Sequence, residues 1–233
     1  MRLPLRLSAL AALLVLAGCD TFGPKKPPEP PPAKPVVALA LGGGAAKGFA
    51  HIGVIKALEA QGIVPDIVVG TSAGSVVGAM YASGKSGFEL QQLAITLDEA
   101  QVSDWSLPDR GVLKGDALAG FINKAVNNVT IEKLPKKFGA VATDLASGEP
   151  IVFRSGDTGT AVRASSSVPG VFQPVAIRGR EYVDGGLVSP VPVRFAQEMG
   201  ATFVIAVDIS NKPQASKTKS SLDILMQTFA IMG

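Results

Sequence analysis

Five residues with the spacing Gly-x-Ser-x-Gly, Gly70-Thr71-Ser72-Ala73-Gly74, stand between an apolar run and a stretch rich in Ala, Val and Met. The apolar run, Ile67–Val69, predicts a short buried strand, and the stretch that follows predicts a helix. A sharp turn from strand to helix strains the backbone of the central serine, so the positions two residues away need to lack a Cβ atom. Such a turn holds the Ser72 hydroxyl at the start of a helix, whose dipole favours developing negative charge. The pattern predicts a nucleophilic serine, and a loop rich in Gly and Ser is the alternative.

A nucleophilic serine needs a base, and the sequence holds one histidine, His51. It lies in a predicted helix among apolar neighbours, where a histidine with a structural role is the more common case. The alternative base is a carboxylate that acts directly on Ser72, which requires burial to raise its pKa. Asp184 stands out because it follows a short strand and precedes Gly185 and Gly186; a turn in which it caps these glycines is the alternative. The other aspartates considered for this role are Asp66, Asp98, Asp104, Asp109, Asp116, Asp144, Asp157 and Asp208.

A second glycine-rich segment, Gly42-Gly43-Gly44-Ala45-Ala46-Lys47-Gly48, follows an apolar run and precedes a predicted helix. Such a loop offers backbone N–H groups to an anion. A dinucleotide-binding loop would need glycine where Lys47 stands, and a phosphate-binding P-loop would need the order Gly-Lys-Ser/Thr. The third interpretation is an oxyanion hole, in which the N–H groups of Gly43 and Gly44 face the carbonyl attacked by Ser72. One such donor lowers a barrier by roughly 3–4 kcal/mol.

The elements that position these residues alternate along the chain from Val36 onward. Continuous apolar runs are typical of parallel strands covered on both faces, and the alternation predicts an α/β fold with a mostly parallel sheet between two layers of helices. Strands are predicted over 36–41, 67–69, 138–143, 150–154, 175–177, 181–183 and 202–207. Helices are predicted over 49–60, 87–97, 116–126, 159–165 and 192–199. A further apolar helical stretch, Leu222–Met232, has no polar end, so we expect the natural chain to continue past Gly233.

Composition narrows the class of protein. The 233 residues are 47% hydrophobic and 18% charged, which allows one sizeable core and favours a single folded domain over 36–233. The net charge of +3 comes from scattered basic residues without aromatic interleaving, which argues against a nucleic-acid partner. One Cys and one His exclude a metal site built on several such ligands.

The N-terminal residues 1–18 have the features of a secretory signal peptide. Arg2 and Arg6 precede an apolar run, Ala9–Leu16, that is too short to span a bilayer. The run ends in Leu16-Ala17-Gly18-Cys19, which resembles the bacterial lipoprotein signal, in which the cysteine is acylated and becomes the new N-terminus. We therefore expect lipidation at Cys19; an ordinary signal peptide or a buried core cysteine is the alternative.

Residues 19–35 contain the lipidated cysteine and a proline-rich segment. Such a segment is extended and semi-rigid, so it predicts a tether between the anchor and the domain, with a PxxP ligand as the alternative. Asp20 is similar to the inner-membrane retention signal of some Gram-negative bacteria. We expect a chain anchored in the bacterial cell envelope and facing the periplasm, at the inner membrane if the host is Gram-negative.

In this order, Gly42–Gly48, Gly70–Gly74 and Asp184-Gly185-Gly186 resemble the motifs of the patatin-like phospholipase family. The segment Ala164–Phe172 is similar to a further sequence block of that family, and the resemblance covers the chain from about Val36 to its end. It implies a three-layer α/β/α sandwich and a Ser–Asp dyad that works without a metal or organic cofactor.

The resemblance also implies a role for each motif residue. Ser72 is the nucleophile, Asp184 the base, and the N–H groups of Gly43 and Gly44 the oxyanion donors, with Gly42 shaping the loop. The implied activity is that of a phospholipase A or lysophospholipase, acting on acyl esters of membrane phospholipid or lysophospholipid. An esterase or thioesterase for other acyl substrates, and a lipid-binding scaffold without activity, are the alternatives.

Two further segments carry open interpretations. The loop departs from the plant-type Gly-Gly-Gly-x-x-Gly pattern, because Lys47 precedes the last glycine, Gly48. Lys47 either favours an anionic head group or is simply solvated. The segment Asp104–Pro108 is a predicted loop that either covers the domain or contacts lipid.

Overall fold

The computed structural model describes residues 34–98, 104, 111–210, 220, 223–224 and 227–228. The chain divides after Lys34 into two units, and the elements described below belong to the second unit, Pro35–Gly233. The signal peptide, Cys19, Asp20, the tether up to residue 33 and Asp109 lie outside the described residues, as do most of Asp104–Pro108 and Leu222–Met232. What the sequence predicts for these segments stays a prediction.

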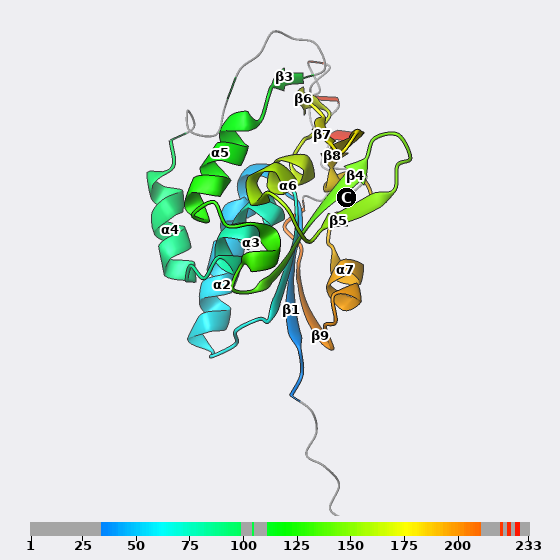
Figure 1. Cartoon of the computed structure of the whole chain (residues 1–233). Coiled ribbons are helices and arrows are strands. Elements are labelled where there is room, and N and C mark those ends of the chain that lie inside the picture. Colours follow the sequence, from blue (N-terminus) through cyan, green and yellow to red (C-terminus); the bar gives the residue numbers. More distant parts are fainter. Residues whose placement is uncertain are drawn as a thin grey trace, which may run out of the picture. The chain divides into compact units, whose positions relative to one another are not determined.

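Seven strands of the described part form one sheet, in the order β7-β8-β4-β2-β1-β9, with β5 also paired to β4 (Figure 1). Four strands are mutually parallel: β1 (Val37–Leu41), β2 (Ile67–Thr71), β4 (Lys137–Asp144) and β9 (Phe203–Val207). Three antiparallel strands extend the sheet: β5 (Pro150–Phe153), β7 (Val175–Ile177) and β8 (Arg180–Asp184). The predicted parallel centre is thus present, with an antiparallel extension beyond β4.

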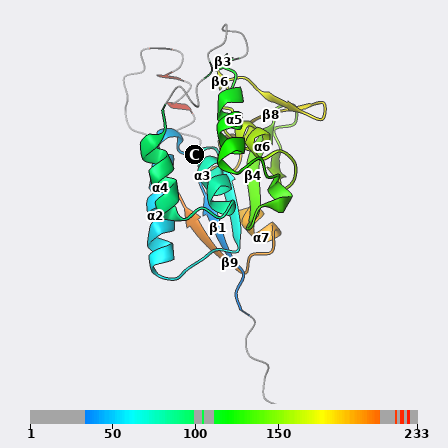
Figure 2. The ribbon, with the colours of Figure 1, turned by 60° about the vertical axis from the view of Figure 1, so that its left-hand side comes forward.

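Helices cover both faces of this sheet, as predicted (Figures 1 and 2). One face carries α2 (Phe49–Ala60), α3 (Ala73–Ala82), α4 (Gly87–Thr96), α5 (Asp116–Ala125) and α6 (Thr158–Ser165). The other face carries α7 (Val193–Glu198), which packs on β1, β2 and β9. Short 3-10 turns stand at η1 (Ala45–Gly48), η3 (Ile131–Lys133) and η4 (Gly185–Leu187).

The alternation of side chains along the strands divides the core into two layers. Leu39 and Leu41 of β1 are fully buried on the face that α2 and α3 cover. Ala38 and Ala40, which point to the opposite face, pack with Phe195 of α7. Because both faces are buried, β1 is a continuous apolar run rather than an alternating one.

A small second sheet was not predicted from the sequence. The strands β3 (Gly111–Leu113) and β6 (Gly170–Phe172) pair in parallel, apart from the main sheet. Each strand has three residues and begins with glycine, so neither carries a periodic pattern. The pairing needs the glycine, because a Cβ atom on Gly111 would lie 2.5 Å from the Phe172 carbonyl carbon.

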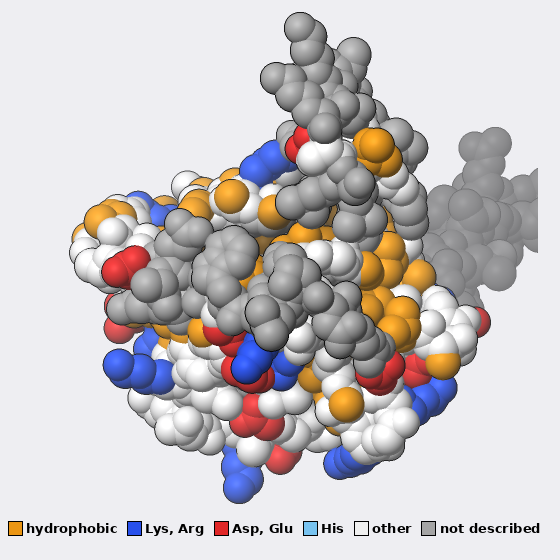
Figure 3. Space-filling view, turned by 90° about the horizontal axis from the view of Figure 1, so that it is seen from above, with side chains coloured by type: hydrophobic (Ala, Val, Ile, Leu, Met, Phe, Trp, Pro, Cys, Tyr) orange, Lys and Arg blue, Asp and Glu red, His pale blue; other side chains and the backbone are white. Residues whose placement is uncertain are grey.

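The carboxyl ends of the parallel strands lie along the upper edge of the domain in Figure 1. Figure 3 looks onto this edge and shows hydrophobic side chains gathered in its central and right-hand part. Within the described residues, no helix has both the length and the apolar character needed to cross a membrane.

Candidate active site

Ser72 occupies the turn between β2 and α3 in a strained backbone conformation. Its φ is 52° and its ψ is −125°, a region that residues with a side chain rarely adopt. A Cβ atom on Gly70 would lie 2.3 Å from the Gly74 carbonyl oxygen, and one on Gly74 would lie 2.1 Å from the Leu41 carbonyl oxygen. Only glycine fits at these two positions, so the spacing of the motif follows from the close approach of β1, β2 and α3.

Strand β4 brings Asp184 to Ser72. β2 pairs with β4 as far as Thr71, which lies opposite Val141, and β8 ends at Asp184, which lies opposite Ala142. β5 pairs with one edge of β4 over this same stretch. β2 and β8 therefore both lie along the opposite edge of β4, where the end of one strand meets the end of the other. Ser72 directly follows Thr71, so the serine and the aspartate are neighbours along β4 although they are far apart in the sequence.

The carboxyl group of Asp184 is buried, with 4% of the residue exposed. Its Oδ1 accepts a hydrogen bond from the Gly186 N–H at 2.7 Å, while its Oδ2 has no hydrogen-bond partner among the described residues. Burial raises the pKa of Asp184 to about 6, while the Ser72 hydroxyl, which lies close enough to favour the charged form, and the Gly186 N–H act in the opposite direction. A carboxylate with a pKa near neutrality suits proton transfer, and its unpartnered oxygen can receive the Ser72 proton.

Residues at the end of α6 and in β4 hold the backbone of Ser72 and of Asp184 through hydrogen bonds. The Ser72 N–H donates to Ser165 Oγ at 3.0 Å, and Ser165 Oγ donates to a carbonyl of β4 at 2.6 Å. The Asp184 N–H donates to the Ser167 carbonyl at 2.9 Å, and Thr143 Oγ1 donates to the Asp184 carbonyl at 2.8 Å. The sequence analysis assigned no role to Ser165, Ser167 or Thr143, although the two serines lie in the segment 164–172 that resembles a block of the family.

The glycine loop after β1 lies against Ser72, since a Cβ atom on Gly43 would be 3.4 Å from the Ser72 Cβ. Its two predicted oxyanion donors differ. The Gly43 N–H already donates to the Pro190 carbonyl at 2.9 Å, so an oxyanion would have to compete for it. The Gly44 N–H, in contrast, has no acceptor among the described residues. Gly42 is fixed at the end of β1, because its N–H donates to the Val207 carbonyl at 2.9 Å.

His51 supports this loop. The side chain is fully buried in α2, and its Nε2 lies 2.8 Å from the Gly42 carbonyl oxygen. A carbonyl only accepts, so Nε2 carries the proton and Nδ1, which has no partner among the described residues, does not. Burial lowers the pKa of His51, while the bond to Gly42 acts in the opposite direction. The contacts give His51 the structural role that its apolar surroundings suggested.

Lys47 does not point freely into solvent. Its Nζ donates to the Ile209 carbonyl at 2.9 Å and so connects the glycine loop to the segment after β9. A Cβ atom on Gly44 would lie 2.7 Å from the Ile209 side chain, which places the same segment against the other side of the loop. Neither interpretation of Lys47 from the sequence included this contact.

Six other described aspartates have partners away from Ser72. Asp66 accepts from the Val37 N–H, Asp157 caps α6, and Asp104 accepts from the N–H groups at the start of α5. Ion pairs and turns engage a further three: Asp116 with Arg163, Asp144 with Arg180 and Asp208 with Ser210. The described part of the chain also holds no group of three His, Cys, Asp or Glu side chains placed to bind a metal ion.

An apolar groove of about 180 Å³ opens beside the turn that carries Ser72. Ala73 follows Ser72, and Ala45 follows Gly44, so the groove begins where the two site segments meet. Along α3 its lining reaches Met80, a distance of about 10 Å at 1.5 Å per residue. The lining residues are Ala45, Ala46, Gly48, Phe49, Ile52, Ala73, Val76, Val77, Met80, Leu90, Leu93, Ala94, Leu97 and Phe121.

Comparison with known proteins shows the family of the chain. The sequence profile of the family described as patatin-like phospholipase matches residues 39–196. This chain belongs to that family. The matched residues include the glycine loop, the Ser72 turn and Asp184.

The relatives are longer proteins. An uncharacterized NTE family protein of Mycobacterium tuberculosis is 38% identical over 181 residues, which are 76% of this chain and 50% of the relative. Human patatin-like phospholipase domain-containing protein 6 is 34% identical over 186 residues, and lysophospholipase NTE1 of Coccidioides immitis is 36% identical over 188 residues. These matches cover 14% and 12% of the two proteins. The chain thus spans half or less of the length of these three relatives.

Among solved structures, VipD from Legionella pneumophila shares the fold. The TM-score is 0.54 at 18% sequence identity, over 67% of this chain and 46% of VipD. The likeness concerns the architecture of the sheet and its helices.

Proposed function

We propose that this patatin-like domain is a serine lipid acyl hydrolase of the phospholipase A or lysophospholipase type. The observation that carries the proposal is the meeting of Ser72 with the buried, half-satisfied carboxyl group of Asp184 beside an apolar groove. Family membership supports the same activity, as does the name of the fungal relative, a lysophospholipase.

Acylation begins when Oδ2 of Asp184 takes the proton from Ser72 Oγ, which attacks the carbonyl carbon of the ester. The C=O electron pair moves onto oxygen, and the Gly44 N–H stabilises the resulting oxyanion. The carbon–oxygen bond to the alcohol then breaks, and the leaving alkoxide takes the proton from Asp184.

Deacylation repeats the same steps with water. Asp184 takes a proton from a water molecule, whose oxygen attacks the acyl-Ser72 ester. Collapse of the second tetrahedral intermediate breaks the bond to Ser72 Oγ, which recovers the proton from Asp184. The products are a fatty acid and the free serine, and no metal or cofactor takes part.

The substrate that fits this arrangement has a long acyl chain. Its chain lies along α3 in the apolar groove, and its ester carbonyl lies between Ser72 and the glycine loop. Membrane phospholipid and lysophospholipid both meet this requirement. Other acyl esters and thioesters share the same reacting group, so a panel of substrates distinguishes them.

We also propose that the mature chain is anchored in the bacterial envelope through acylated Cys19. The support is the signal-like segment 1–18, the position of the sole cysteine and the proline-rich tether that follows it. Several acyl chains hold a protein stably, because each buried methylene contributes about 0.8 kcal/mol. In this arrangement the domain would face the periplasm, at the inner membrane if the host is Gram-negative.

The deciding experiment compares wild-type and Ser72→Ala protein on a panel of phospholipids and lysophospholipids, with mass analysis of the products. We expect fatty acid release by the wild-type protein only, together with covalent labelling of Ser72 by a fluorophosphonate probe. Ser83→Ala, which removes a hydroxyl at the far end of α3, serves as the matched control and should keep both. Fatty acid release by Ser72→Ala at the wild-type rate would refute the proposal. A folded wild-type protein that neither reacts with the probe nor releases fatty acid would indicate a lipid-binding scaffold.

A further inference from the structure

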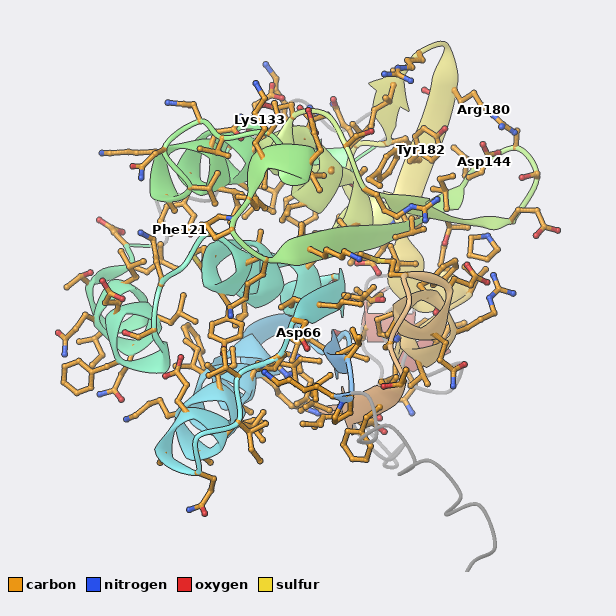
Figure 4. All side chains as sticks on the ribbon, turned by 60° about the horizontal axis from the view of Figure 1, so that its bottom comes forward. Asp66, Phe121, Lys133, Asp144, Arg180 and Tyr182 are labelled. Carbon is orange, nitrogen blue, oxygen red and sulfur yellow. The ribbon has the colours of Figure 1, made fainter. Side chains whose placement is uncertain are left out.

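A second cavity, of about 470 Å³, lies away from the apolar groove, between β5, the β7–β8 hairpin and the start of α6. We call it the arginine pocket. Figure 4 shows two of its residues, Arg180 and Tyr182 of β8, together with Asp144 of the neighbouring strand. Its lining residues are Ile151, Val152, Phe153, Arg154, Ser155, Gly156, Asp157, Thr160, Ala161, Ile177, Arg178, Arg180 and Tyr182.

Apolar and aromatic side chains form much of the pocket wall. The rings of Phe153 and Tyr182 meet edge to face, with their centroids 5.0 Å apart. Ile151 of β5 and Ile177 of β7 add aliphatic surface, and Ile151 is 37% exposed. This wall suits the hydrocarbon or glycerol part of a ligand rather than a simple inorganic ion.

Three arginines add positive charge to the same cavity. Arg180 is already paired, because its Nε lies 2.8 Å from Asp144 Oδ2. Arg154 and Arg178 are exposed and have no acidic or hydrogen-bonding partner among the described residues. The acid in the lining, Asp157, is engaged as the cap of α6, where it accepts from the Thr160 N–H at 2.7 Å.

The hairpin turn fixes where these charges stand. Arg178 and Gly179 have φ values of 51° and 78°, as in the tight two-residue turn that suits a twisted hairpin. Along β8, side chains alternate between the two faces of the sheet, so Arg180 and Tyr182 lie on the same face as Asp184. The arginine pocket therefore lies on the face of the sheet that also carries the candidate active site.

We propose that the arginine pocket binds the phosphate group of an anionic phospholipid, separately from the substrate at Ser72. A planar guanidinium matches two phosphate oxygens at once, which is the contact available from Arg154 and Arg178. The glycerol and the first methylenes of the lipid lie against Phe153 and Tyr182. The inference rests on the proposed function only in that the domain works at a phospholipid surface, since binding in the pocket needs no turnover.

The test uses the full chain carrying Ser72→Ala, purified in a non-ionic detergent, so that no lipid is consumed. Calorimetric titration with dihexanoylphosphatidylglycerol is compared with the zwitterionic dihexanoylphosphatidylcholine and with inorganic phosphate. We expect the anionic lipid to bind at least about tenfold more tightly than either of the other two. Arg154→Gln combined with Arg178→Gln should weaken this binding about tenfold or more, because the loss of even one charge-assisted contact costs about that factor.

Arg194→Gln is the matched control, because it removes the same charge from α7 on the opposite face of the sheet. It should leave the affinity unchanged, and an unchanged melting temperature shows that each variant is folded. Binding that survives the double substitution, or anionic-lipid binding no tighter than that of phosphatidylcholine, overturns the proposal. Inorganic phosphate that binds as tightly as the lipid overturns its lipid part.

Fluorophosphonate labelling of Ser72, measured in the same arginine variants without Ser72→Ala, separates this inference from the proposed function. Labelling should be unchanged when both arginines are replaced. A chain that binds the anionic lipid through its arginines but fails to react with the probe would leave the inference intact and refute the hydrolase.

Discussion

At the scale of single residues, the candidate site depends on one carboxyl group that is kept away from water. Asp184 gains one hydrogen bond at Oδ1 and none from a described residue at Oδ2, so its charged form is poorly solvated. A protein does not retain such a group for stability, because burial of an ill-satisfied charge is costly. The group is the kind that an active site uses for proton transfer.

Replacing Asp184 with asparagine should therefore abolish activity and stabilise the fold. The pKa of Asp184 is raised to about 6 in the folded state, so the native protein binds this proton more tightly than the unfolded chain does. Wild-type stability then falls as the pH rises from about 4 through 6, by up to about 3 kcal/mol. Asp184→Asn lacks this loss and should unfold at higher denaturant concentration at pH 7.5, with little difference near pH 4.

Urea unfolding at several pH values checks the stability, and ester hydrolysis checks the activity, which should fall on the acid side with an apparent pKa of about 6. Asp66→Asn is the control, since Asp66 accepts one backbone hydrogen bond near the start of β1 (Figure 4) and asparagine can accept it too. If Asp184→Asn and wild type show the same dependence of stability on pH, the carboxyl group is not buried as described.

His51 gives a prediction that separates support from catalysis. In His51→Gln the amide can still donate to the Gly42 carbonyl, so most of the activity should remain. In His51→Ala that carbonyl loses its buried donor, which costs about 1–3 kcal/mol of stability and loosens the loop. Thermal unfolding and a pH–rate profile check both variants, and neither should move the acid limb of the profile. A limb that disappears with His51 would identify the histidine as the base.

Residues whose role depends on local spacing could be predicted from the sequence. Residues whose role depends on contacts with distant parts of the chain could not. The strained turn at Ser72 and its need for glycine on either side could be predicted from five adjacent residues. The difference between the Gly43 and Gly44 N–H groups could not be predicted in this way. The acceptor that engages the Gly43 N–H is the Pro190 carbonyl, which is far away in the sequence. The role of Ser165 likewise depends on a contact across the fold.

At the scale of elements, the parallel centre of the sheet was predictable because doubly buried strands are continuous apolar runs. The order of the strands was not, since every such run looks alike. The short strands β3 and β6 also escaped prediction, because three residues are too few to show a period of two. What the structure adds is the register of β4, which pairs with β2 and β8 along one edge and so joins the two halves of the site.

The apolar groove along α3 predicts a chain-length effect. Val76 is half-buried and lines the groove, so Val76→Phe should fill it without entering the core. Each methylene that loses its apolar contact costs about 0.8 kcal/mol, so kcat/KM for a long-chain p-nitrophenyl ester should fall about tenfold or more, while the acetate ester is unaffected. Val64→Phe, at a position that is 58% exposed and outside the groove, is the matched control. Equal losses on both esters would show that the groove does not hold the chain.

At the scale of the whole molecule, the sequence predicts a lipid anchor at Cys19, ahead of the folded domain. If Cys19 is acylated, Cys19→Ala should abolish incorporation of an alkyne-labelled fatty acid and leave the signal segment uncleaved. Metabolic labelling and the apparent mass of the protein check this, with Ser72→Ala as a control that should label normally. A labelled Cys19→Ala protein would contradict the lipoprotein interpretation.

The meeting of β2 and β8 on one edge of β4 has a consequence for how the chain can be divided. Residues 145–149, between β4 and β5, are all exposed, and a break there leaves Ser72 and Asp184 on different pieces. Under the proposed mechanism, neither half alone should hydrolyse an ester, and two co-expressed halves that rebuild the sheet should regain hydrolysis. If the proposed activity holds, the domain should work as a split reporter, whose signal depends on restoring the antiparallel pairing of β5 and β8 with β4.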